Sequence, residues 1–108
     1  MTKYILFIVC CMLMAFGCKT EAMVAKTKRA DHVRKLVAQS EMEACTRAGL
    51  HEPLWQECGS GTMCFFCADE VGVMNRVIPP ACSTSRIDEH WLLETEDACL
   101  AYEKKQAQ

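Results

Sequence analysis

The stretch that organises the rest of the chain is Cys58-Gly59-Ser60-Gly61-Thr62-Met63-Cys64-Phe65-Phe66-Cys67. It holds three of the nine cysteines of this 108-residue chain, and its one Phe-Phe pair. Two cysteines separated by two residues can bind a metal ion, act as a redox couple or belong to a disulfide framework. The choice among these depends on the compartment in which the protein matures, and the N-terminal segment indicates that compartment.

The N-terminus has the pattern of a secretory signal peptide. Lys3 is followed by an apolar run of thirteen residues, 4–16, which is shorter than the roughly 20 residues of a membrane span. Small residues that suit cleavage precede Cys18 and Met23, and we predict a signal peptide over residues 1–22. The alternatives are a short N-terminal anchor helix and a lipidated junction at Gly17-Cys18.

A dibasic pair, Lys28-Arg29, follows the leader and resembles a site for a prohormone-type endoprotease. We therefore predict a propeptide over 23–29 and a mature domain over 30–108. Removing residues 1–29 discards three cysteines and leaves an even number, as a secreted disulfide framework requires. The six that remain are Cys45, Cys58, Cys64, Cys67, Cys82 and Cys99. A second pair, Lys104-Lys105, precedes a polar tail and is predicted to be trimmed, the alternative being a frayed, uncut end.

Charge separates at the same point. Residues 1–29 carry five basic side chains and one acidic side chain, whereas residues 30–108 carry seven basic and thirteen acidic side chains, a formal charge of −6. A product this acidic is a poor ligand for nucleic acid and for anionic membranes.

Hydrophobic periodicity predicts an all-α or mainly α fold, a small disulfide-stapled domain with two longer helices around a short central one. The first helix is expected over 31–48, capped by Asp31 and ended by Gly49. The central helix is expected to run from Thr62 to about Val71. Ser85 and Asp88 form a capping box that opens a final helix over about 86–104.

The buried sides of the longer helices are predicted from helical spacing. They comprise Val33, Leu36, Val37, Ser40, Ala44 and Ala48 in the first helix, and Ile87, Trp91, Leu92, Thr95, Ala98, Cys99 and Tyr102 in the last. Trp55 lies in a connector between helices and is predicted to anchor the core rather than to stack on a ligand.

The six mature cysteines are predicted to form three disulfides. A zinc site usually presents two tight ligand pairs and only one is present, and a thioredoxin-like couple needs a strand before it, which Gly-Ser-Gly does not supply. A chain of this size also needs covalent staples. If Cys64 and Cys67 share a helix face, they most naturally bond to Cys45 and Cys99 on the longer helices, which leaves Cys58 and Cys82 to close loops.

No catalytic residue, metal ligand or cofactor is predicted. The three histidines lie on separate segments, and no serine occupies the strained turn of a hydrolase nucleophile. The chain is therefore expected not to be an enzyme. Its expected partner is an extracellular receptor or ion channel of a target cell, bound by a monomer.

The layout of signal peptide, dibasic propeptide and six-cysteine product is similar to that of invertebrate venom-peptide and neurohormone precursors. The resemblance is one of organisation, since the cysteine spacing departs from the arthropod hyperglycaemic-hormone and insulin patterns. It implies a secreted toxin that acts on an ion channel or receptor, or an endogenous peptide hormone. A protease inhibitor or lipid carrier is the alternative from another class. The acidic product favours gating or receptor binding over pore block, which normally uses a basic face.

Overall fold

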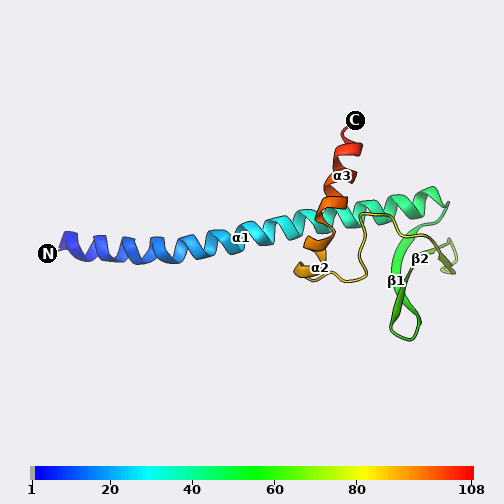
Figure 1. Cartoon of the computed structure of the whole chain (residues 1–108), viewed down its shortest axis with the longest axis horizontal. Helices are drawn as coiled ribbons and strands as arrows, with labels where there is room; N and C mark the ends of the chain where they lie inside the picture. The colour runs from blue at the N-terminus through cyan, green and yellow to red at the C-terminus, as the bar shows by residue number, and fades with distance from the viewer. Residues whose placement is uncertain (1) are drawn as a thin grey trace.

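The computed structural model describes the backbone of residues 2–108 and the side chains of residues 24–108. In chain order the elements are α1 (Thr2–Arg47), β1 (Glu52–Gly59), β2 (Thr62–Ala68), β3 (Met74–Arg76), α2 (Glu89–Glu94) and α3 (Glu96–Gln106). Helix α1 is a long rod; α2 and α3 lie across its middle, and the sheet lies at its C-terminal end (Figure 1). Side chains of the predicted signal peptide, residues 1–22, lie outside the described part.

Helix α1 starts well before the predicted position, so the predicted cap at Asp31 is wrong. Residues 18–30 contain no glycine or proline and are rich in alanine and lysine, which favour helix. Asp31 instead accepts a hydrogen bond from Arg34 one turn later. The predicted end is confirmed: Gly49 has a φ of 76°, and Leu50 N donates to Cys45 O at 2.8 Å. Within the described residues, no helix combines the length and apolar character needed to cross a membrane.

The predicted central helix is wrong, because this stretch forms a β-hairpin. Strands β1 and β2 pair antiparallel, with Trp55 opposite Phe65 and Gln56 opposite Cys64. Gly61, with a φ of 73°, turns the chain between them, so Gly-Ser-Gly is a hairpin turn rather than the entry to a helix. With β3 the sheet has three strands in the order β1-β2-β3. The fold is therefore a mixture of helices and an antiparallel sheet, and the all-α or mainly α prediction is corrected.

Strand geometry also changes which side chains of β2 share a face. Residues three apart share a helix face but lie on opposite faces of a strand. Cys64 and Cys67 therefore point in opposite directions, and Phe65 joins Cys67 on the buried side. The aromatic and β-branched residues of this stretch suit a half-buried strand.

The predicted final helix is two helices with a break at Thr95. Asp88, not Ser85, is the N-cap of α2, and its carboxylate accepts from Trp91 N at 3.1 Å. Thr95 Oγ1 donates to Leu92 O at 2.9 Å, where α2 ends. Ile87 precedes the cap and is 70% exposed, so its predicted burial is wrong.

Two separate clusters of buried side chains lie along α1. The helical cluster joins α1 to α2 and α3 and consists of Ala30, Val33, Leu36, Val37, Cys82, Leu92 and Cys99, with Tyr102 packed against it. The sheet cluster joins the end of α1 to the hairpin and consists of Cys45, Phe65 and Cys67, with Ala44, Leu50, Trp55 and Val77 packed against it. The predicted stripe of the first helix is confirmed from Val33 to Ser40, whereas Ala48 is exposed.

Ion pairs border the helical cluster. Three basic side chains of α1 meet three glutamates of α2 and α3, in the pairs Lys26–Glu89 at 3.8 Å, Arg29–Glu96 at 3.5 Å and His32–Glu103 at 2.7 Å. The side chains are exposed or half-buried, and His32 is charged only when protonated, so each pair contributes at most about 1 kcal/mol. Their importance lies in position, since they extend the contact of α1 with α2 and α3 into the predicted propeptide.

Candidate functional site

All six cysteines of residues 30–108 are paired, which confirms three disulfides. The bonds are Cys45–Cys67, Cys58–Cys64 and Cys82–Cys99. One expected link from the short element to a long helix is present, since Cys67 bonds to Cys45 of α1. The other expected links are not, because Cys64 faces the opposite side of β2 and bonds across the hairpin.

Each disulfide has a distinct structural role. Cys45–Cys67 ties the end of α1 to the middle strand and lies inside the sheet cluster. Cys82–Cys99 fastens the loop after the sheet to α3, inside the helical cluster. Cys58–Cys64 closes a loop of the hairpin itself, with a sequence separation of only 6. The framework therefore holds the sheet in a fixed position against α1.

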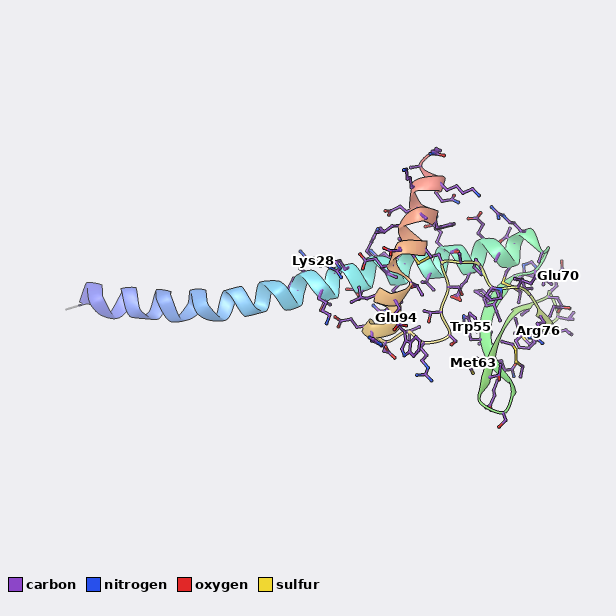
Figure 2. All side chains as sticks on the ribbon, viewed as in Figure 1. Lys28, Trp55, Met63, Glu70, Arg76 and Glu94 are labelled. Carbon is purple, nitrogen blue, oxygen red and sulfur yellow. A yellow bond between two sulfur atoms is a disulfide. The ribbon has the colours of Figure 1, made fainter. Side chains whose placement is uncertain are left out.

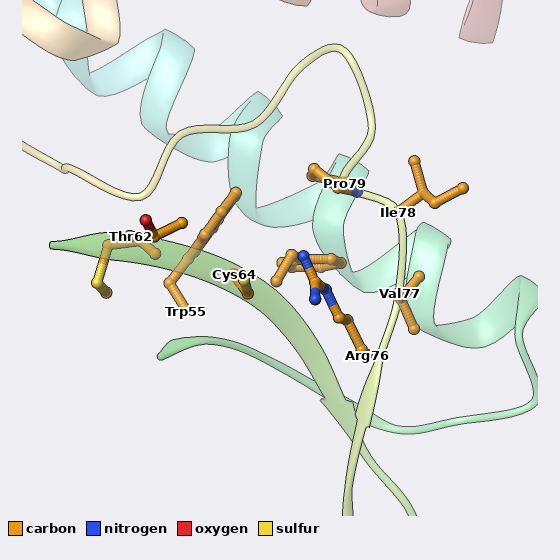
Figure 3. A pocket seen from close by; sticks show the side chains of 9 residues that line it. Trp55, Thr62, Cys64, Arg76, Val77, Ile78 and Pro79 are labelled. Carbon is orange, nitrogen blue, oxygen red and sulfur yellow. The ribbon is translucent and has the colours of Figure 1, made fainter. Parts of the chain in front are cut away.

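A hollow on the described surface lies beside the hairpin. We call it the sheet groove; it has a volume of about 480 Å³ and is lined by Trp55, Thr62, Met63, Cys64, Phe65, Arg76, Val77, Ile78 and Pro79. Figure 3 shows the Arg76 side chain directed toward the middle of the groove, with Trp55 on one side and Val77 on the other. The volume is in the range of small-ligand and peptide sites, and the lining is mostly apolar.

Large apolar side chains are exposed around the groove. Ile78 at its rim is 89% exposed, and Met63 of β2 is 43% exposed. Leu54 of β1, and Val71 and Val73 of the turn after β2, are exposed as well, but none of the three lines the groove. Single exposed apolar residues are ordinary, but a group of them around a hollow is typical of a binding surface.

A buried carboxylate connects the hairpin to the loop that follows the sheet. Glu41 of α1 is 9% exposed and accepts two hydrogen bonds at Oε2, from Trp55 Nε1 at 2.6 Å and from Ser83 Oγ at 3.0 Å. Burial raises the pKa of Glu41 above its ordinary value of 4.5, and the two hydrogen bonds oppose this shift without cancelling it. Trp55 is thus a partly buried anchor, as predicted, and its indole N–H is satisfied.

Glu41 is expected to make the protein more stable in mild acid than at neutral pH. Because the pKa is higher in the folded state than in the unfolded chain, the contribution of Glu41 is complete below pH 4.5 and is lost as pH rises through the folded-state pKa. Glu41→Gln should remove this part of the pH dependence while keeping an acceptor for Trp55 and Ser83. Thermal unfolding between pH 4 and pH 8 measures it.

Two further variants test the same prediction. Glu41→Ala should cost about 1–3 kcal/mol at every pH, because it leaves buried donors without an acceptor. Glu70→Gln serves as the matched control, since the Glu70 side chain is 90% exposed. A Glu41→Gln protein with the same pH dependence as the wild type would show that the carboxylate ionises freely in the folded state.

A second polar contact holds α3 to α1. The Tyr102 hydroxyl donates to Glu43 Oε2 at 2.6 Å, and Arg47 pairs with the other oxygen of the same carboxylate. Burial, followed by the hydrogen bond and the negative charge of Glu43, raises the pKa of Tyr102 to about 12. The hydroxyl is therefore a donor throughout the physiological pH range.

The predicted processing residues lie in two different settings. Lys28 and Arg29 lie within α1, and the next residue, Ala30, is only 3% exposed in the helical cluster. Figure 2 shows Lys28 where the rod of α1 reaches the side chains of α2. Lys104 and Lys105 are exposed in the last turn of α3.

A metal ion needs a defined arrangement of ligand side chains. No group of three histidine, cysteine, aspartate or glutamate side chains in residues 24–108 has the arrangement needed to hold a metal ion. Sequence reasoning missed both Glu41 and Arg76, the two polar groups that mark the buried junction and the groove. The turn residues Gly59 and Gly61 could have identified the hairpin.

Comparisons with known proteins add no relative. No family model matches the chain, and neither a curated protein nor a solved structure is significantly similar to it.

Proposed function

We propose that this chain is the precursor of a secreted disulfide-rich peptide that acts on an extracellular receptor or ion channel. The observation that carries the proposal is the pairing of every cysteine in residues 30–108, behind an N-terminus that has the pattern of a signal peptide. Disulfides of this density belong to small domains that mature in an oxidising compartment.

The exposed surface supports binding as the activity. The sheet groove and the apolar side chains around it are held by disulfides at both ends of β2, so a partner meets a largely preformed site. Preformed sites lose little entropy on binding. The formal charge of −6 over residues 30–108 argues against direct block of a cation-selective pore and for a receptor or gating element.

Toxin and hormone share this architecture and differ in where the precursor is made. Expression in a venom gland supports the toxin, and expression in neurosecretory cells supports the hormone. The intact mass of the natural product, before and after reduction, tests secretion, both termini and the disulfide count in one measurement. A product that retains residues 1–22, or that contains free thiols, contradicts the proposal.

Activity is tested by applying the oxidised protein to target cells and recording calcium entry and membrane current. The reduced and alkylated protein is the negative control. Met63→Ser, in the groove, should weaken the response, whereas Val71→Ser, which lies outside the groove and is 82% exposed, should not. Equal responses to the oxidised and reduced proteins would rule out a folded ligand as the active species.

A further inference from the structure

The edge of β2 beside the sheet groove is open. Strand β3 pairs only with residues 66–68 and ends at Arg76, opposite Phe66. One more hydrogen bond follows, from Val77 N to Phe65 O at 3.0 Å, and the chain then leaves through Ile78 toward two prolines. Among the described strands, residues 62–64 of β2 therefore pair with β1 on one side and with no strand on the other.

The backbone groups on this edge can be assigned. In an antiparallel strand, the N–H and C=O of one residue point to one edge, and those of the next residue point to the other. Because Phe65 O bonds to Val77, the polar groups of Phe65 and of Met63 point to the β3 edge. Met63 thus presents a donor and an acceptor to the groove, as an exposed strand edge does for an added strand.

The groove also contains one charged group. Arg76 is the only charged residue among the nine that line it, in a domain with an excess of acidic side chains. Among the described residues, the Arg76 guanidinium has neither a hydrogen bond nor an ion pair. The planar N–H donors of a guanidinium fit a carboxylate. A segment that covers the groove would also exclude water from an ion pair between Arg76 and an acidic side chain of that segment.

We propose that the sheet groove binds an extended segment of the target protein, which adds a strand to the open edge of β2 and places an acidic side chain against Arg76. This inference rests on the proposed function, since the target is the receptor or channel on which the peptide acts. Apolar side chains of the segment pack on Met63 and Ile78, which line the groove and are exposed. A second copy of this chain is a poor occupant, because two domains of −6 repel each other.

The test uses the full oxidised chain and a synthetic peptide of alternating valine and threonine with one central glutamate, blocked at both ends. Amide resonances of Met63 and Phe65 in ¹⁵N-labelled protein report binding at the edge. The glutamate peptide should bind at least about fivefold more tightly than the same peptide with glutamine. Methylating the peptide nitrogens that face β2 should abolish binding, because the strand pairing is lost.

A charge exchange provides the matched control. Arg76→Glu should fold normally, since the side chain is exposed and has no partner in the described structure. It should reject the glutamate peptide and bind a lysine peptide about as well as the wild type binds glutamate. The control is Arg86→Glu. The Arg86 guanidinium lies outside the groove, 4.9 Å from the centroid of the Trp91 ring, so this variant should leave binding unchanged.

Several outcomes overturn the proposal. The first is no shift of either amide resonance at about 1 mM peptide, and the second is equal affinity for the glutamate and glutamine peptides. The others are binding of dodecanoate without binding of peptide, and shifts that depend on protein concentration alone.

Cell responses separate this inference from the proposed function. A wild-type response that Arg76→Glu retains, without peptide binding, overturns the groove proposal alone, whereas peptide binding without any cell response overturns the function alone.

Discussion

Replacing Cys45 and Cys67 together with alanine is expected to lower the midpoint of thermal unfolding by roughly 12–24 °C. The disulfide closes a loop with a sequence separation of 22, and its loss costs about 3 kcal/mol in the loop-entropy description. Both sulfurs are fully buried in the sheet cluster, so packing is lost as well. Few other contacts hold the hairpin to α1, and Trp55 should leave Glu41 in the same transition.

Tryptophan fluorescence and far-ultraviolet circular dichroism recorded together on heating measure this effect. The matched control is the double alanine variant of Cys58 and Cys64, which closes a loop with a separation of only 6 and costs about 2 kcal/mol. The control should loosen the hairpin turn while Trp55 keeps its contact with Glu41. Equal midpoints for the two variants would mean that the Cys45–Cys67 bond is not what fixes the sheet to α1.

The second large effect concerns the predicted cleavage after Arg29. We expect the folded, oxidised protein to resist a dibasic-specific endoprotease at this bond, and the reduced chain to be cut at least about a hundredfold faster. Arg29 lies inside α1 and pairs with Glu96, and the next residue is buried. A local opening that costs about 3 kcal/mol leaves roughly one molecule in a hundred open to the protease. If the natural product begins at Ala30, cleavage therefore precedes folding.

Two variants separate burial from charge in that experiment. Leu92→Ala removes a fully buried side chain of the helical cluster, which costs about 2–5 kcal/mol and should speed cleavage after Arg29. Glu96→Gln removes only the half-buried ion pair with Arg29 and should change the rate little. The exposed pair Lys104-Lys105 is an internal reference, and the same rate at both sites in the folded protein would contradict the protection of Arg29.

The parts of the fold that follow from local sequence were predictable. The stripe from Val33 to Ser40 repeats at helical spacing, and Gly49 follows the last helical turn, so this half of α1 could be read directly. The even cysteine count predicted three disulfides. Neither conclusion depends on how distant segments meet.

The hairpin was missed because short apolar runs fit a helix and a strand equally well. Gly59 and Gly61 decide between them, since Gly61 takes a positive φ in a turn that joins two paired strands. Glu41 could not have been identified in advance. Its role depends on Trp55 and Ser83, which lie 14 and 42 residues away in sequence.

The division of the buried residues into a helical cluster and a sheet cluster has an evolutionary consequence. The two clusters share no residue, and each contains its own disulfide. Substitutions in separate clusters have nearly additive effects on stability, so a change in one needs no compensating change in the other. The hairpin can therefore change in sequence while α2 and α3 stay as they are, provided that Glu41 keeps its two donors.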